Sequence, residues 1–168
     1  MRRRTFLLLS AMAGVGLVAG TLTAFGAGSP RDTPVAVRVV DGDTLAVDGQ
    51  RIRLFGIDAP ERDQNCEADG RSYPCGRAAS EALARLIGNS RLSCVEHDRD
   101  PYGRSVATCT AAGRDLNREM VAEGWAVAYT RYSRDYVRDE AEARRARRGL
   151  WQGRFERPEQ YRVNHRPS

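Results

Sequence analysis

Residues 41–44 read Asp-Gly-Asp-Thr, and residues 53–61 read Arg-Leu-Phe-Gly-Ile-Asp-Ala-Pro-Glu. These two stretches organise the chain, and they bring together three carboxylates and one guanidinium: Asp43, Arg53, Asp58 and Glu61. Carboxylates that lie close together repel and raise one another's pKa. A hard cation with oxygen ligands would relieve that repulsion. The cluster therefore predicts a cation site, with the arginine left to contact an anion.

The same region predicts a three-stranded β-meander. Two Asp-Gly pairs separate short runs rich in β-branched residues, which occupy residues 35–40, 44–47 and 51–55. An Asp-Gly pair between two such runs is a strong hairpin signal. Side chains alternate along a strand, so Ile52 and Leu54 share one face. Arg53 then projects from the opposite face, away from the core.

The remaining elements follow from turn residues and from the spacing of apolar positions. Residues 58–76 contain two prolines and two cysteines and read as an ordered loop, which inside a compact domain is usually functional. We expect two further strands and three helices, at residues 92–96 and 105–109 and at residues 77–87, 115–123 and 136–148. Five strands, with helices after the third and the fifth, indicate an α+β fold: a five-stranded OB-fold β-barrel with three helices.

The N-terminus predicts an export signal over residues 1–26. Three arginines at 2–4 precede an apolar run from Phe6 to about Phe25, and the small residues near Gly26 suit cleavage there. The arginines also resemble a twin-arginine signal, so we expect a secreted or cell-envelope protein. An uncleaved membrane anchor is the alternative, because the run approaches the roughly 20 residues that span a bilayer.

The charge balance gives only weak information about the partner. All 27 basic side chains are arginine, against 22 acidic residues. Loss of the signal would remove three arginines and leave 24 basic against 22 acidic residues, a net charge of +2. Local basic patches could still bind a polyanion, but the overall charge does not identify nucleic acid as the ligand.

Four cysteines in an exported protein indicate disulfides. If Cys94 and Cys109 lie on adjacent strands of a hairpin, they pair with each other and leave Cys66 to pair with Cys75. Closing the loop between Cys94 and Cys109 could contribute about 3 kcal/mol by the chain-entropy relation. A zinc site is the alternative, although the sequence contains no Cys-x-x-Cys pair.

A second motif, Asp-Pro-Tyr-Gly-Arg at residues 100–104, joins the first two stretches. Together the motifs resemble the staphylococcal nuclease family, which shares the Asp-Gly-Asp-Thr turn, the strand arginine and the Ile-Asp-Ala-Pro-Glu run. The resemblance covers residues 35–151, which we expect to be the domain, and leaves residues 152–168 as a weakly ordered tail. It implies an OB-fold and a Ca²⁺-dependent nuclease.

The resemblance also implies roles for individual residues. It makes Asp43, Asp58 and the main-chain carbonyl of Ala59 the ligands of Ca²⁺. It places Glu61 beside the water that attacks phosphorus, and it sets Arg53 and Arg104 against the phosphate, where planar guanidiniums fit phosphate oxygens. Solvated surface positions are the alternative interpretation of Glu61 and of both arginines.

Three tyrosines stand where the family has tyrosines near the nucleotide: Tyr102, Tyr129 and Tyr132. They predict stacking on bases or contact with phosphate, and ordinary packing is the alternative for each. We interpret the two histidines, His97 and His165, as surface residues.

These features predict an exported nuclease that hydrolyses DNA or RNA with little sequence specificity. In the family's reaction, water attacks in line, the 5′ oxygen leaves and the product carries a 3′-phosphate. We expect a monomer without a stable protein partner, which would meet a membrane only if the N-terminal segment is uncleaved. The alternatives are a noncatalytic OB-fold module that binds nucleic acid or envelope polysaccharide, and a membrane-anchored nuclease.

Overall fold

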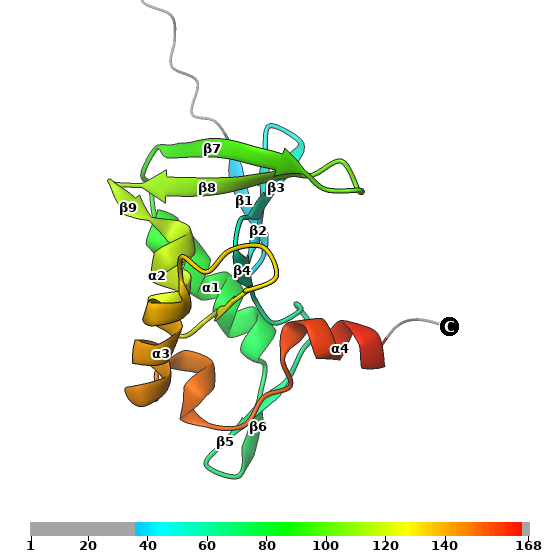
Figure 1. The fold of residues 1–168 in the computed structure, drawn as a ribbon, viewed down its shortest axis with the longest axis vertical. Coiled ribbons are helices and arrows are strands. Elements are labelled where there is room, and N and C mark those ends of the chain that lie inside the picture. Colours follow the sequence, from blue (N-terminus) through cyan, green and yellow to red (C-terminus); the bar gives the residue numbers. More distant parts are fainter. Residues whose placement is uncertain (1–35, 166–168) are drawn as a thin grey trace, which may run out of the picture. The chain divides into compact units, whose positions relative to one another are not determined.

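A six-stranded sheet carries the fold of residues 36–165, the part of the chain that this computed structural model describes (Figure 1). Its strands lie in the order β1, β2, β3, β8, β7, with β9 beside β8. Their bounds are Val37–Asp41, Thr44–Val47, Gln50–Leu54, Ser105–Ala111, Leu92–Arg99 and Arg114–Asp115 in that same order. β3 and β8 pair in parallel, and the other neighbours pair antiparallel. The five predicted strands are therefore present, and the sequence analysis missed the short β9.

Two small sheets lie outside the main one. β4 (Ile57–Asp58) pairs with β10 (Val127–Ala128), so that Asp58 lies opposite Val127. β5 (Cys66–Ala68) and β6 (Arg71–Tyr73) form a hairpin inside the segment that the sequence analysis treats as a loop.

Four α-helices occur in residues 36–165, where the sequence analysis predicts three. They are α1 (Cys75–Ile87), α2 (Leu116–Ala122), α3 (Val137–Arg145) and α4 (Pro158–Asn164), and a 3₁₀ helix, η1, spans Gly149–Gln152. As predicted, Asp115 caps α2, because its side chain accepts a hydrogen bond from the Arg118 main-chain N–H. The unpredicted helix is α4, and with it the expectation of a weakly ordered tail is wrong for the described residues 152–165.

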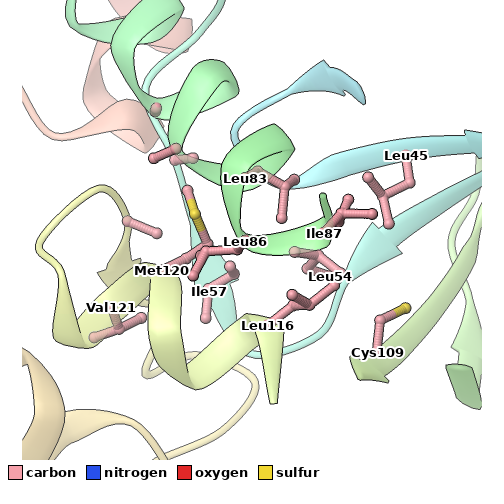
Figure 2. Packing of buried hydrophobic residues seen from close by; sticks show 14 of the residues in the cluster. Leu45, Leu54, Ile57, Leu83, Leu86, Ile87, Cys109, Leu116, Met120 and Val121 are labelled. Atoms are coloured by element: carbon pink, nitrogen blue, oxygen red, sulfur yellow. The ribbon is translucent and has the colours of Figure 1, made fainter. Parts of the chain in front are cut away.

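The core lies between the sheet, α1 and α2. Figure 2 shows Leu45, Leu54 and Ile57 packed against side chains of both helices: Leu83, Leu86, Ile87, Leu116, Met120 and Val121. Leu83 and Leu116 are fully buried, and truncating such a leucine to alanine costs about 2–5 kcal/mol. The buried Leu54 lies one residue after Arg53, and the buried Ile57 lies one residue before Asp58. Core packing therefore fixes the strands that carry both site residues.

Both predicted disulfides are present, Cys66–Cys75 and Cys94–Cys109. Cys94 and Cys109 face each other directly across β7 and β8, as the hairpin prediction required. None of the four cysteines is free, so the zinc interpretation is wrong.

The C-terminal segment packs against the hairpin that the first disulfide closes. Arg154 and Glu67 exchange two main-chain hydrogen bonds, of 2.9 and 2.8 Å. Leu150 is buried with Cys66 and Cys75 in a second small apolar cluster. The segment between η1 and α4 is therefore attached to the domain through its backbone.

The predicted export signal, residues 1–26, lies outside the described residues. Among residues 36–165, no helix is long and apolar enough to cross a membrane.

Candidate active site

The side chains of the candidate site come from four neighbouring pieces of backbone. Asp43 lies in the turn between β1 and β2, Arg53 near the end of β3, Asp58 at the end of β4, and Glu61 in the loop that follows. The main-chain N–H of Leu54 donates to the carbonyl of Asp43 over 2.8 Å. This bond fixes the turn against β3, so Asp43 and Arg53 come from backbones that are held together.

Arg53 joins the two aspartates. Its Nη2 lies 3.2 Å from Asp43 Oδ2 and 2.8 Å from Asp58 Oδ1, and its Nη1 lies 3.3 Å from Asp43 Oδ1. Asp43 is 3% exposed and Asp58 is 1% exposed. The prediction that both aspartates converge on one point with Arg53 agrees with this geometry.

The turn that carries Asp43 fits closely against its surroundings. Asp43 Oδ2 accepts a hydrogen bond of 3.0 Å from the main-chain N–H of Ala59, and Thr44 Oγ1 donates to Asp43 Oδ1 over 3.0 Å. A Cβ added at Gly42 would lie 2.7 Å from the Cβ of Ala59 and 2.8 Å from that of Ala79. Only glycine fits there, so the close approach of the turn to Ala59 depends on Gly42.

Burial and pairing act against each other on these charges. Burial raises the pKa of Asp43 above its ordinary value, and Arg53 offsets only part of that rise. For Arg53, burial acts to lower the pKa, but Asp43 and Asp58 outweigh it, so the pKa is raised and the guanidinium stays charged. The pair of aspartates thus sits where a cation is needed to compensate buried negative charge.

The main chain of Glu61 is held in place by contacts with Gln64 and Gly76. Gln64, which is fully buried, accepts a hydrogen bond of 3.2 Å from the Glu61 N–H through Oε1 and donates one of 2.9 Å to the Glu61 carbonyl from its own N–H. A Cβ added at Gly76 would lie 1.8 Å from the Glu61 carbonyl oxygen. The start of α1 therefore touches the loop at Glu61, and only glycine permits the contact.

A second arginine enters the site from α4, and the sequence analysis missed it. Arg162 Nη1 lies 2.9 Å from Asp58 Oδ1 and 2.8 Å from Glu61 Oε1, and Nη2 lies 3.0 Å from Asp58 Oδ2. Burial acts to lower the pKa of Arg162, but the bonds to Asp58 and Glu61 outweigh it and raise that pKa. The sequence feature that could have predicted the start of α4 is Pro158, because proline is favoured at the first position of a helix.

Arg104 lies apart from the carboxylates. Its Nε donates to Asp100 Oδ2 over 2.6 Å, and its main-chain N–H donates to Asp100 Oδ1 over 2.9 Å. Burial acts to raise the pKa of Asp100, but these bonds outweigh it and hold that pKa below its usual range. Within residues 36–165, no hydrogen bond or ion pair connects Arg104 to Asp43, Asp58 or Glu61. It stands just before Ser105, which pairs with Ile52 of β3, so it lies along the same sheet.

The three tyrosines fall into two places. Tyr102 is 86% exposed and lies beside Arg104, whose guanidinium carbon is 5.7 Å from the ring centre. Tyr129 and Tyr132 contact each other, with ring centres 5.0 Å apart. Tyr129 and Asp58 also line one small cleft of about 110 Å³. Tyr129 thus borders the carboxylate site and Tyr132 contacts Tyr129, whereas Tyr102 lies on the hairpin of Arg104.

The donor set suits a hard cation by type. A single atom, Arg53 Nη2, touches both Asp43 and Asp58, so the two carboxylates lie close enough to share one cationic partner. Within residues 36–165, no three His, Cys, Asp or Glu side chains form a group that could hold a metal ion. A Ca²⁺ ion would therefore need main-chain oxygen, such as the carbonyl of Ala59, and water to reach its usual six to eight ligands.

A family model described as staphylococcal nuclease homologue matches residues 51–153, which also establishes the OB-fold class of this α+β domain. The succinoglycan biosynthesis protein ExoI of Rhizobium meliloti (strain 1021) is 38% identical over 114 residues, which make up 66% of this chain and 60% of ExoI. An uncharacterized endonuclease of Escherichia coli O157:H7 is 36% identical over 122 residues, 68% of this chain and 74% of that protein. The probable staphylococcal-like nuclease CAN1 of Oryza sativa subsp. japonica is 33% identical over 112 residues, 66% of this chain and 31% of CAN1. The chain thus covers less than two thirds of ExoI and of CAN1.

Proposed function

Because the chain belongs to the staphylococcal nuclease homologue family, whose nucleases are typically Ca²⁺-dependent, we propose that it is an exported, Ca²⁺-dependent nuclease. Family membership supports nuclease activity in general. The proposal adds a substrate, DNA or RNA cut with little sequence specificity, and a 3′-phosphate product. One observation supports it: the buried Asp43 and Asp58 share Arg53, and Arg162 joins Asp58 to Glu61, so three acidic side chains and two arginines form one cluster.

In this proposal each charged residue has a separate task. Asp43, Asp58 and the carbonyl of Ala59 would hold Ca²⁺, which supplies positive charge to a bound phosphodiester. Glu61 accepts the proton of the attacking water as the new bond to phosphorus forms. The bond from phosphorus to the 5′ oxygen breaks, and that oxygen takes up a proton from solvent as it leaves.

The arginines stabilise the charge that grows on the phosphate. Arg53 lies between the two aspartates and can turn its free donor positions toward a phosphate oxygen, as a planar guanidinium does. Arg104 would give a second contact through guanidinium donors other than the Nε that is bonded to Asp100. Removing one donor that stabilises a transition-state charge typically costs about 10²–10³ in kcat.

Glu61→Gln tests the proposed base. The variant keeps the shape of the side chain but cannot take a proton, so we expect folded protein that cleaves single-stranded DNA at least about a hundredfold more slowly. Glu142→Gln, which removes an exposed acid on α3, is the matched control and should cleave at the wild-type rate. Wild-type cleavage by Glu61→Gln would remove Glu61 from the mechanism.

A noncatalytic module that binds polysaccharide or nucleic acid is the second candidate. It is favoured by the name of one relative, ExoI, which refers to succinoglycan biosynthesis. Burying charged groups such as Asp43 and Asp58 costs free energy, and in a noncatalytic domain the cluster that they form with Glu61 and Arg53 would serve no reaction. Binding of single-stranded DNA by wild-type protein with saturating Ca²⁺ but without cleavage would favour this candidate over the nuclease.

A further inference from the structure

Arg162 occupies the carboxylate oxygens that the proposed Ca²⁺ site needs. It contacts both oxygens of Asp58, at 2.9 and 3.0 Å, and Oε1 of Glu61, at 2.8 Å. Arg53 takes the Oδ1 of Asp58 as well. Both oxygens of Asp58 are therefore engaged by guanidinium groups, so Arg162 competes with a divalent ion for this carboxylate.

The segment before α4 is firmly anchored. Arg154 is bound to the β5 strand through two main-chain hydrogen bonds with Glu67, and the carbonyl of Glu156 accepts a 2.7 Å bond from Nε2 of the buried Gln64. The Cys66–Cys75 disulfide closes the hairpin that contains Glu67, and Gln64 lies two residues before Cys66. α4 thus begins from a fixed point close to the carboxylates.

α4 itself is held much more weakly than its anchor. Of its seven residues only Pro158 is buried, and Arg162 is 35% exposed along its side chain. Among the described residues, α4 also has an exposed hydrogen bond of 3.3 Å from Tyr129 to Glu159 and a long ion pair of 3.7 Å between Arg131 and Glu159. At its other end, Asn164 donates a hydrogen bond to the Glu156 side chain of the preceding segment. A short helix with one buried residue and a fixed start can leave its place without unfolding the domain.

We propose that α4 is a releasable plug, in which Arg162 is a tethered cation that Ca²⁺ must displace from Asp58 and Glu61. This inference rests on the proposed Ca²⁺ site and adds a restraint on its use. In the plugged state Arg162 pairs with Oε1 of Glu61 and with both oxygens of Asp58, so it competes at the proposed metal site and at the proposed base together. The ion pair between Arg162 of α4 and Asp58 of β4 is what links the helix to the site.

The plug lowers the apparent affinity for Ca²⁺ by a factor that depends on the fraction of molecules in which it is closed. When only a fraction of molecules is competent to bind, the apparent dissociation constant rises in inverse proportion to that fraction. A plug that is closed in about nine molecules of ten therefore weakens Ca²⁺ binding about tenfold. Removing the guanidinium should raise the apparent Ca²⁺ affinity by the same factor.

The direct test is Ca²⁺ binding measured by calorimetry on the wild type, Arg162→Gln, Arg162→Lys and Arg145→Gln. Arg145 is an exposed arginine on α3, so its variant makes the same charge change away from the site. We expect Arg162→Gln to bind Ca²⁺ about tenfold more tightly than the wild type and Arg145→Gln. The Ca²⁺ affinity of Arg162→Lys should lie between those of the wild type and Arg162→Gln. Lysine keeps the charge but cannot contact both oxygens of Asp58 with a planar fork.

Hydrogen exchange on the wild type gives a second readout that needs no variant. Saturating Ca²⁺ should speed amide exchange in residues 158–165 while the core strands stay protected; unchanged exchange there would overturn the plug. Equal Ca²⁺ affinities for the wild type and Arg162→Gln would also overturn it, and weaker DNA binding in that variant would then make Arg162 a phosphate ligand. If neither protein binds Ca²⁺, the proposed metal site is wrong and the plug falls with it, whereas equal binding refutes the plug alone.

Discussion

Arg53→Gln should destabilise the protein strongly when Ca²⁺ is absent. Arg53 is 18% exposed along its side chain, and it contacts two aspartates that are almost fully buried. Removing one partner of a buried ion pair costs about 3–5 kcal/mol, because the other charge is left uncompensated. Asp58 keeps Arg162, whereas Asp43 has no other cationic partner within residues 36–165. Because only one of the two aspartates would be left uncompensated, we expect a loss of unfolding free energy at the lower end of the range, about 3 kcal/mol.

The loss should depend on pH with a defined sign. Burial already raises the pKa of Asp43, and removal of Arg53 takes away the main opposing influence, so that pKa rises further. A group whose pKa is raised by folding destabilises the native state increasingly as the pH rises through the folded value. The deficit of Arg53→Gln should therefore be largest near neutral pH and shrink as the pH is lowered.

Urea unfolding in a chelator, followed across pH, measures both effects. Arg51→Gln is the matched control, because Arg51 is an exposed arginine two residues earlier in the same strand. Adding Asp43→Asn to Arg53→Gln should recover part of the lost stability, since the buried charge is then gone. A loss under about 1 kcal/mol, close to the value for an exposed pair, would refute the reasoning that these charges are coupled.

Two further changes probe the surroundings of the site. Asp100→Asn should lower the free energy of unfolding by about 1.5–3 kcal/mol, because the Asp100 carboxylate accepts bonds from the Arg104 side chain and from two main-chain N–H groups. Asp100 has a folded pKa below its usual 3.8, so the difference in unfolding free energy between variant and wild type should vanish as the pH falls through that folded pKa. A difference that stays constant with pH in urea unfolding would contradict this. Gly76→Ala should slow cleavage and cost about 1–3 kcal/mol, because its Cβ would lie 1.8 Å from the Glu61 carbonyl. Gly70→Ala meets no atom within 4 Å, and although its φ of +72° disfavours alanine, it lies away from Glu61 and should leave cleavage unchanged. Equal kinetics for the two variants would refute the positioning role of Gly76.

The strands and the paired aspartates could be predicted because their signals are local. The two Asp-Gly turns fix the meander, and alternation then places Arg53 on the face opposite Leu54. The hairpin of β7 and β8 brings Cys94 opposite Cys109, so the disulfide pattern follows from strand register. Such inferences need only neighbours in sequence or across one turn.

The role of the C-terminus could not be predicted in the same way. α4 has seven residues and buries only Pro158, so it lacks the apolar periodicity by which a helix is recognised. Arg162 meets Asp58 and Glu61 across about a hundred residues, and nothing local marks that contact. Gln64 and Gly76 were missed for a related reason: their importance lies in what the folded backbone leaves room for.

Arg104 shows the limit of transferring a motif. The Asp100 to Arg104 segment is present as predicted, but Asp100 holds Arg104 within its own hairpin. The motif identifies the residue type just before β8, which is Arg104. The orientation of its side chain depends on local hydrogen bonds such as the one to Asp100. Arg104 thus remains a predicted phosphate contact whose side chain is oriented by Asp100 through Nε.

The central claim is that acidic residues of this site hold a calcium ion that a nuclease reaction requires. The measurement that tests it most directly is cleavage of single-stranded DNA by the purified protein, first in excess chelator and then with Ca²⁺ restored. The account predicts no cleavage in the chelator, recovery with Ca²⁺, and no recovery in an Asp43→Asn, Asp58→Asn double variant. Cleavage that continues unchanged in the chelator, or that the double variant retains, would contradict the claim.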